Sequence, residues 1–374
     1  MRHLLPVLRW LFDGMHLIFP VPLTLPGPRM LAALGFTALI ILSSGLALAA
    51  VKPSPRSLKA SPIPIDARPI SSFDRASSSK MRFGRLVWRG GLVLTSPSPH
   101  FGGWSAIEMS PDGRAFLAVS DAGTWLRGRL TYAGVAPRGV DGAVIGPIQA
   151  KNGTPLARSR DRDAEGLALV RGSIESGEVY VSFEGNHRVG RFPLTREGLG
   201  TPTGYLANPK DLKRSRRDGM ESLATIDGGR FKGALVAFAE EADEGTGYHR
   251  GWIWVRGEAR QLNVVSRDGF ALTAAASLED GSLLLLERRF RILEGVRMRM
   301  RLIQADKIEP GAVLDGETLI QADLGQEIDN MEGLGVHTES DGTTVLTILS
   351  DDNFNPVLQR TLLLQFSLER PLVK

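Results

Sequence analysis

Five segments of the chain repeat one pattern: a short strand, a turn built on Asp-Gly or Ser-Gly, and a second strand that ends at an acidic residue. The segments are residues 105–123, 165–185, 221–241, 273–289 and 332–352. Their starts lie 60, 56, 52 and 59 residues apart. Repeats of this length, made of short strands, are typical of a β-propeller, because small sheets packed around one axis bury faces that a single sheet leaves exposed.

The sequence between the repeats indicates how each blade is completed. Further strand candidates follow the second strand of a repeat, for example 125–132 and 252–256, so that about four strands form one blade. The stretch 360–368 reads as a closing strand beside 84–95, which lets the two ends of the body complete one blade. We therefore expect an all-β propeller of five or six blades, with room for a sixth in 81–103 or 290–330.

Composition and charge exclude several classes of protein. Of the 374 residues, 43% are hydrophobic and 23% are charged, as in globular proteins. The chain has no cysteine, which excludes disulfides, cysteine-ligated zinc, iron–sulfur clusters and cysteine nucleophiles. The net charge is +4, and half of it lies in the first 50 residues, so the body has no basic field that would attract nucleic acid.

An uncharged apolar run covers residues 30–51, directly after Arg29. Its length exceeds the roughly 20 residues that span a bilayer, and it ends in small residues that suit a signal peptidase. Segment 1–50 is therefore either a cleaved signal peptide or an uncleaved membrane anchor formed by an N-terminal apolar helix. Both alternatives predict an exported body, periplasmic or at the cell envelope, which is attached to the inner membrane if the segment is not cleaved.

Sequence rich in Pro and Ser, without apolar periodicity, fills residues 51–80, and we interpret it as a linker. The propeller domain is then expected over 81–374, with the fold beginning near Met81. Two basic stretches, 151–163 and 208–219, are predicted surface loops, either solvated blade edges or a patch for an anionic ligand.

Acidic residues recur at equivalent points of the repeats. Three repeats open with Glu, a small residue and Leu, at Glu165, Glu221 and Glu332, and another acid follows 19 residues after each. The acids at the ends of the second strands are Asp121, Glu184, Glu240, Glu287 and Asp351. Because equivalent positions of successive blades form a ring, all eight carboxylates are expected to face the axial channel if these strands are the inner ones.

Eight converging carboxylates need cations, because buried like charges repel one another. Arginines stand beside several of the acids: Arg127, Arg188, Arg288, Arg289 and Arg291. A divalent ion is the other solution, and Ca²⁺ is favoured because it accepts several oxygen ligands in flexible geometry. The last repeat is richest in such oxygens, at Asp351, Asp352 and Asn353. A structural role for each carboxylate, as an acceptor of backbone N–H groups, stays open.

Several stretches also resemble a known family. They are GWSAIEMSPDGRAFLAVSDAG (103–123), DAEGLALV (163–170), GMESLA (219–224), LTAAASLEDGSLLLLERRF (272–290) and NMEGLGVHTESDGTTVLTILSDDNF (330–354). Through them residues 81–370 resemble the phytase-like domain proteins of bacteria, named for the esterase-like activity of phytase. The resemblance implies an exported β-propeller with phosphoesterase or esterase activity, whose acidic motif positions are Glu165, Glu221, Glu332, Asp351, Asp352 and Asn353.

Other hydrolase motifs are absent from the sequence, which has no Gly-x-Ser-x-Gly elbow, no His-Glu-x-x-His and no Walker loop. Among the six histidines, His187 follows Glu184 and His337 follows the strand that Glu332 begins. Each is either a general base that reaches the channel or an ordinary loop histidine.

Three functions fit these features. The first is metal-assisted hydrolysis of a small phosphoester or carboxylic ester, with Glu165, Glu221, Glu332, Asp351 and Asp352 as metal ligands. In this hypothesis the catalytic groups are Glu165, Glu332, Asp351 and His187, and the substrate is bound by Arg127, Arg188 and Arg288. The second is a non-catalytic binding propeller at the cell envelope with a structural ring of acids and arginines. The third is a sugar-lactone hydrolase that holds a metal in a similar propeller.

Overall fold

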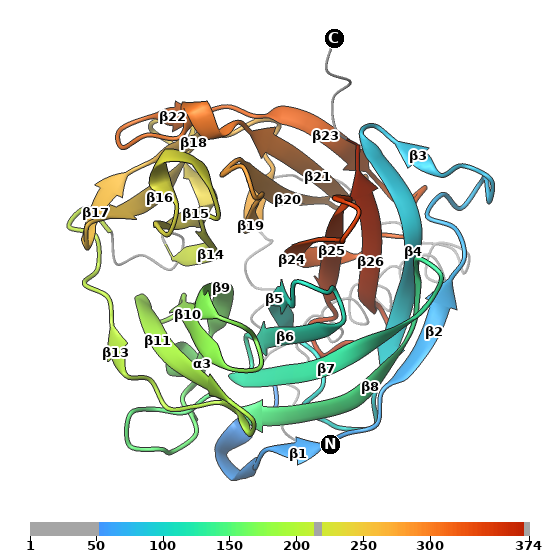
Figure 1. Cartoon of the computed structure of the whole chain (residues 1–374), viewed down its shortest axis with the longest axis horizontal. Coiled ribbons are helices and arrows are strands. Elements are labelled where there is room, and N and C mark those ends of the chain that lie inside the picture. Colours follow the sequence, from blue (N-terminus) through green and yellow to red (C-terminus); the bar gives the residue numbers. More distant parts are fainter. Residues whose placement is uncertain (1–51, 213–218, 370–374) are drawn as a thin grey trace, which may run out of the picture. The chain divides into compact units, whose positions relative to one another are not determined.

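Five sheets surround a common axis in the part of the chain that the computed structural model describes, residues 52–212 and 219–369 (Figure 1). The first two blades, written from the outer edge inward, have these strands. Blade 1 consists of β1 (Ser61–Pro62), β8 (Ala136–Pro147), β7 (Thr124–Ala133), β6 (Ala115–Ser120) and β5 (Trp104–Met109). Blade 2 consists of β12 (Gly198–Leu199), β11 (Arg188–Thr195), β10 (Gly177–Phe183) and β9 (Ala164–Gly172), with β13 (Gly204–Tyr205) paired to β11.

The other three blades follow the same plan. Blade 3 consists of β22 (Val313–Leu314), β18 (Asn263–Val265), β16 (Tyr248–Val255), β15 (Leu235–Asp243) and β14 (Met220–Thr225), with β17 (Glu258–Gln261) paired to β16. Blade 4 consists of β23 (Glu317–Ala322), β21 (Gly295–Ile303), β20 (Leu283–Arg291) and β19 (Ala271–Ser277). Blade 5 consists of β2 (Asp66–Ile70), β4 (Leu86–Thr95), β26 (Thr361–Leu368), β25 (Thr344–Asp351) and β24 (Asn330–Thr338), with β3 (Arg82–Phe83) paired to β4.

Each of the five sequence repeats forms the two innermost strands of one blade, so the prediction of an all-β propeller is confirmed with five blades. Three of the connecting turns have the same structure. Gly113, Gly281 and Gly342 adopt positive φ, as the Asp-Gly pairs predict. The preceding aspartate in each turn accepts a hydrogen bond from the backbone N–H two residues later, at 2.8–3.0 Å, which fixes the turn.

The two ends of the body close the ring within blade 5. β26 pairs with β4 along its whole length, from Thr361 opposite Leu94 to Leu368 opposite Leu86, and this confirms the expected closing strand. The stretches that had room for a sixth blade complete other blades: 81–103 holds β3 and β4, and 290–330 holds β21, β22 and β23.

The fold begins earlier than the Met81 we expected. β1 pairs with β8, and β2 pairs with β4, so the Pro- and Ser-rich segment adds edge strands to blades 1 and 5. Proline is tolerated there because an edge strand has N–H groups that need no ladder partner. Phe73 of this segment is fully buried and stacks on Trp88.

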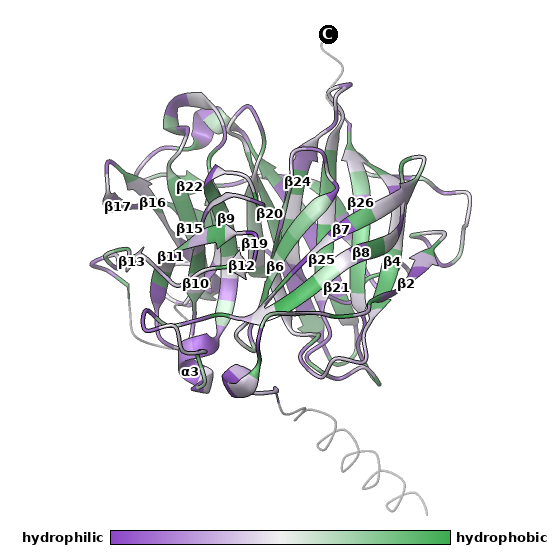
Figure 2. Ribbon diagram, turned by 60° about the horizontal axis from the view of Figure 1, so that its bottom comes forward, coloured by the Kyte–Doolittle hydropathy of each residue, from purple (hydrophilic) through white to green (hydrophobic). Residues whose placement is uncertain are grey.

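Apolar side chains from neighbouring blades pack together in the core. Figure 2 shows that the strands are largely hydrophobic in sequence. The helices in the described part of the chain are single turns: η1 (Pro55–Ser57), α3 (Ser159–Arg162), η3 (Gly229–Phe231) and η4 (Ala305–Lys307). Within residues 52–212 and 219–369, no helix is long and apolar enough to cross a membrane. The apolar run 30–51, for which we expected a helix, lies outside the described residues.

Candidate active site

All five inner strands carry a β-bulge at an equivalent position, close to the end of the propeller at which these strands begin. We call this end the ring face; α3 leads directly into β9 there (Figure 2). The strand register shifts at each point, so that the inner strand has one residue more than its partner. The residues at the shifts are Ser105, Glu165, Glu221, Thr273 and Glu332. A β-bulge redirects a side chain out of the regular alternation, so the three glutamates turn toward the same channel.

A second set of ring positions lies at or near the ring-face end of each second strand. The strand pairing places these positions at Asp121, Glu184, Glu240, Arg288 and Asp351. In blade 4 the position therefore belongs to Arg288, and Glu287, which we expected in the ring, lies one residue away. Successive strand residues point to opposite sides. Glu287 is fully buried on the other side, where Arg299 and Arg301 donate hydrogen bonds to it at 2.5–3.0 Å.

The ring carboxylates come close enough together to share an ion. Asp163, Glu165 and Glu184 each offer an oxygen, and these atoms all lie within 4.8 Å of one another. Glu184, Glu221 and Glu240 form a second such group. Glu184 belongs to both groups, so one side chain connects the acids of blades 2 and 3.

Two cations of the chain already contact the ring. Arg288 lies 2.9 Å from Glu240 and 3.3 Å from Glu332. The Lys52 ammonium lies 2.5 Å from Asp121 and 3.8 Å from Asp163. Together the two cations contact four carboxylates: Asp121, Asp163, Glu240 and Glu332.

Burial raises the pKa of several ring carboxyls, because it disfavours their charged form. It raises the pKa of Glu332 to about 7, although the Arg288 charge acts in the opposite direction. The pKa values of Glu165, Glu221 and Asp351 lie well above the ordinary range, first because of burial and then because of neighbouring carboxylates. The channel therefore takes up protons or other cations readily.

These pKa values predict how the stability of the metal-free protein depends on pH. A group whose pKa is raised in the folded state binds its proton more tightly there, so its contribution is complete below the unfolded pKa and is lost as pH rises through the folded one. For Glu332 that loss runs from the ordinary value of 4.5 up to about 7. We expect the melting temperature in chelator to fall between about pH 5 and about pH 8. A melting temperature that rises over this range would contradict the assignment.

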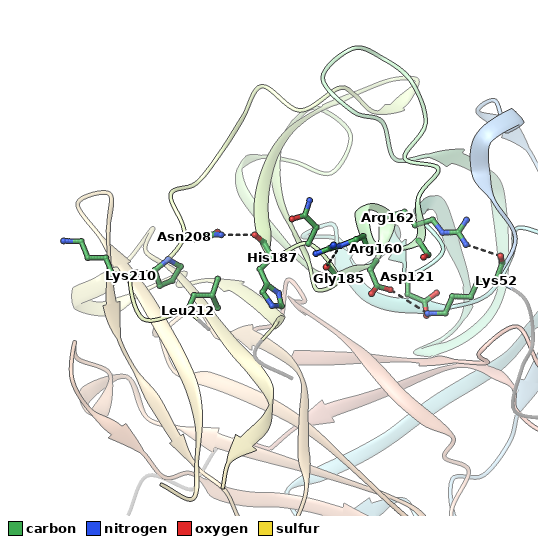
Figure 3. Close-up of a pocket in the computed structure, with 13 residues that line it drawn as sticks. Lys52, Asp121, Arg160, Arg162, Gly185, His187, Asn208, Lys210 and Leu212 are labelled. Atoms are coloured by element: carbon green, nitrogen blue, oxygen red, sulfur yellow. Dashed lines mark hydrogen bonds and ion pairs between the residues drawn. The ribbon is translucent and has the colours of Figure 1, made fainter. Parts of the chain in front are cut away.

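A cavity of about 990 Å³ opens beside the ring, and it is lined by both acidic and basic groups (Figure 3). Its charged side chains are Lys52, Asp121, Arg160, Arg162, Asp163 and Lys210. Arg160 and Arg162 come from the basic stretch 151–163, and Lys210 comes from 208–219, so both basic stretches reach the same cavity. His187 also lines it.

The start of the described chain lines this cavity through Lys52. Arg162 donates hydrogen bonds to the carbonyl oxygens of Pro53, at 2.8 Å, and Lys52, at 3.1 Å. These bonds hold the backbone where the Lys52 side chain can reach Asp121 (Figure 3). The ammonium therefore occupies a position where it competes with any other cation for Asp121 and Asp163.

This competition predicts the effect of removing the ammonium. Lys52→Ala should increase the affinity for a divalent ion by roughly threefold to fivefold, the strength of a partly exposed ion pair. Lys59→Ala, an exposed lysine of the same segment, is the matched control and should have no effect. Calorimetric titration with Ca²⁺ measures both variants. Equal or weaker affinity of Lys52→Ala would show that Lys52 does not compete.

The other residues that the sequence suggested for the site lie at different places in the fold. Arg127 lies in the middle of β7, away from the ring, and donates to the backbone oxygen of Thr195 in blade 2. Arg188 stacks on the Phe183 ring, 3.8 Å from its centre, beside the cavity. His337 lies at the far end of its inner strand, where it lines a second cavity of about 390 Å³ with Glu108, whose pKa burial raises to about 8.

Asp352 is placed as a structural residue and not as a member of the ring. Its carboxylate accepts hydrogen bonds from the Gly103 and Phe354 N–H groups and from the Thr361 hydroxyl, at 3.0–3.2 Å. Asp351 precedes it and takes the ring position, because consecutive extended residues point to opposite sides.

Sequence reasoning missed two members of the site. Asp163 stands two residues before Glu165 in DAEGLALV, so the motif contained the signal. Lys52 belongs to the segment that we interpreted as a linker, and nothing in its composition indicated a contact. Glu184 and Glu240 were recognised as ring acids by their spacing but were not assigned as ligands.

Comparison with known proteins identifies the family. A family model described as "Phytase-like: Esterase-like activity of phytase" matches residues 99–354. No curated protein matches the sequence. Among solved structures, an endo-arabinase from Bacteroides thetaiotaomicron is similar at 12% identity and a TM-score of 0.44, over 74% of this chain and 98% of that chain. The family match covers more than half of the chain and contains every carboxylate of the ring, and the chain therefore belongs to the Phytase-like family.

Proposed function

We propose that the protein is a metal-assisted hydrolase that acts on a phosphoester or carboxylic ester at the ring face. The observation that carries this proposal is the pair of carboxylate groups that share Glu184, each within 4.8 Å, next to a cavity that also presents arginines and a lysine. The family description, esterase-like activity of phytase, supports the same class of reaction.

The residues of the ring fit a hard divalent ion. Every donor in the two groups is a carboxylate oxygen, the ligand type that Ca²⁺ prefers, and Ca²⁺ tolerates the irregular geometry of side chains from several blades. Asp163, Glu165 and Glu184 would form one set of ligands, and Glu184, Glu221 and Glu240 the other. An ion held there would supply Lewis acidity toward the ester oxygen.

Other side chains at the ring face can act as the general base and bind the anionic group of the substrate. Glu332, with a pKa of about 7, can accept a proton near neutral pH, where general-base catalysis is most effective. Arg288 is fixed beside it by ion pairs to Glu240 and Glu332, so its charge stays at the reacting end of the channel. Arg160, Arg162 and Lys210 line the cavity, where they can bind the phosphate or the oxyanion of an ester.

We further propose that the protein works at the cell envelope. The apolar run 30–51 after Arg29 supports export, either as a cleaved signal peptide or as an anchor in the inner membrane. The absence of cysteine fits a protein that folds without disulfides after export.

Chromogenic phosphate monoester and carboxylic ester substrates, assayed with Ca²⁺ and with chelator, test this function. We expect hydrolysis that depends on the ion and that Glu332→Gln lowers by roughly 100-fold or more, because the variant keeps the shape but loses the base. Glu175→Gln, an exposed change at the opposite end of blade 2, should leave the rate unchanged. Absence of hydrolysis with every substrate would favour the binding propeller, for which the ion pairs of Lys52 and Arg288 with the ring are the supporting observation. Equal rates with Ca²⁺ and with chelator would contradict metal assistance.

A further inference from the structure

A protruding hairpin on the ring face exposes large apolar side chains. At the turn between β20 and β21, Ile292 is 90% exposed and Leu293 is 98% exposed, with Phe290 exposed beside them. Burying apolar side chains of this size is favourable, and full exposure of two neighbours at one tip is unusual for a surface that faces only water.

Two neighbouring loops extend this apolar surface. Leu324 packs directly on Gly295, so close that a Cβ at Gly295 would lie 2.4 Å from its methyl group. The loop after Leu324 is tied to the loop between β25 and β26 by the 2.7 Å ion pair between Glu327 and Arg360. That second loop exposes Val357 and Leu358.

All three loops leave the same end of blades 4 and 5, which are neighbours in Figure 1. Together they hold six of the ten large hydrophobic side chains that are exposed within the described ranges. We call this set the apolar loop surface: Phe290, Ile292, Leu293, Leu324, Val357 and Leu358.

Positive charge surrounds the tip of the hairpin. Glu294 accepts ion pairs from Arg289, at 2.6 Å, Arg291, at 3.0 Å, and Arg297, at 3.2 Å. Three arginines around one glutamate leave an excess of two positive charges beside Ile292 and Leu293. Apolar residues at a tip with arginines around them match the interface of an anionic bilayer, where the apolar groups enter the acyl boundary and the cations meet the headgroups.

The first residue that the structure describes, Lys52, also lies on this face. The apolar run 30–51 ends one residue before Lys52, and Lys52 lies on the ring face through its ion pair with Asp121. We propose that the apolar loop surface docks on an anionic lipid bilayer, so that blades 4 and 5 rest on the membrane through the ring face. The cavity lined by Arg160, His187 and Lys210 belongs to the side of blades 1 and 2, so the docking surface is distinct from it.

Single cysteines test this docking, because the chain has none of its own. The full chain is reconstituted into vesicles of phosphatidylcholine and phosphatidylglycerol that carry nitroxide-labelled lipid, with a fluorescent label at Leu293→Cys or Val357→Cys. Val135→Cys is the matched control, because Val135 is an exposed apolar residue at a hairpin tip on the opposite face. We expect blue-shifted emission and several-fold stronger quenching by the lipid at positions 293 and 357 than at position 135.

Two results would overturn the proposal. One is equal quenching at positions 293 and 135 in these vesicles. The other is a label at position 293 that stays water-exposed with vesicles but becomes shielded as the protein concentration rises, which would assign the surface to a second copy of the chain. Unchanged melting temperatures of the labelled variants establish that the fold is intact.

Discussion

Glu184→Gln is expected to weaken Ca²⁺ binding by roughly 100-fold, about 3 kcal/mol, because it removes a charged oxygen from both groups of carboxylates at once. The same variant should be more stable than the natural protein in chelator near pH 8. The reason is that burial and mutual repulsion disfavour several charged carboxylates at this end of the channel. Calorimetric titration measures the first effect, and thermal unfolding in chelator measures the second.

The opposite signs of these two effects make the test specific. A carboxylate that merely holds the fold together would lower the melting temperature when it is changed, with or without the ion. Glu175→Gln, at the far end of the same blade, should change neither quantity. Unaltered Ca²⁺ affinity in Glu184→Gln would show that Glu184 does not join the two groups of ligands.

Glu287→Gln is expected to destabilise the fold by about 3–5 kcal/mol, because it removes the buried counter-charge of two buried guanidinium groups, which keep only the exposed Asp268 and Asp315. Arg299 and Arg301 are 2% and 0% exposed, and both donate hydrogen bonds to the Glu287 carboxylate. Since this ion pair lies outside the ring, the affinity for Ca²⁺ should not change. Urea unfolding at neutral pH measures the loss of stability.

Glu294→Gln is the matched control for this prediction. Like Glu287, Glu294 forms ion pairs with arginines of blade 4, but it does so on the exposed hairpin. Its three partners are Arg289, Arg291 and Arg297. Water screens these pairs, so the change should cost less than about 1 kcal/mol. Similar losses in the two variants would mean that burial does not set the strength of the Glu287 pairs.

The architecture could be predicted because the propeller repeats its local signals. The Asp-Gly pairs that end at Gly113, Gly281 and Gly342 predict hairpin turns, because glycine readily adopts the positive φ that such turns need. The repeats give the position of the inner strands. The closing strand was also predictable, since 360–368 is an apolar stretch after the last repeat and 84–95 is one before the first. The edge strands β1 and β2 were not, because two to five residues rich in proline carry no strand periodicity.

The sequence predicted the ring positions correctly except in blade 4, where the prediction was one residue out of register. The error matters because it placed the acid Glu287 where the structure has the cation Arg288. Nineteen residues separate the two ring positions in three blades, but sixteen separate Ser105 from Asp121 and fifteen separate Thr273 from Arg288, because the hairpins differ in length. Counting acids therefore selected Glu287, whereas the strand pairing selects Arg288. A step of one residue in a strand exchanges the channel side for the buried side.

The contacts between residues far apart in the chain could not be predicted from the sequence, for a different reason. Lys52 meets Asp121 only because Arg162, more than a hundred residues away, holds the backbone of Lys52 and Pro53. Likewise, Asp163 and Glu184 come together because β9 and β10 are paired neighbours, not because of their spacing.

The melting temperature of the protein in Ca²⁺, compared with that in chelator, tests the metal centre most directly. An ion that binds only the folded state stabilises it by mass action, by about 2.7 kcal/mol at a hundred times its dissociation constant. We predict a clear rise in melting temperature with Ca²⁺, larger near pH 8 than near pH 5 because the ring carboxyls must lose their protons to bind the ion. A melting temperature that is the same in Ca²⁺, Mg²⁺, Mn²⁺ and chelator at both pH values would contradict the assignment of the ring as a metal centre.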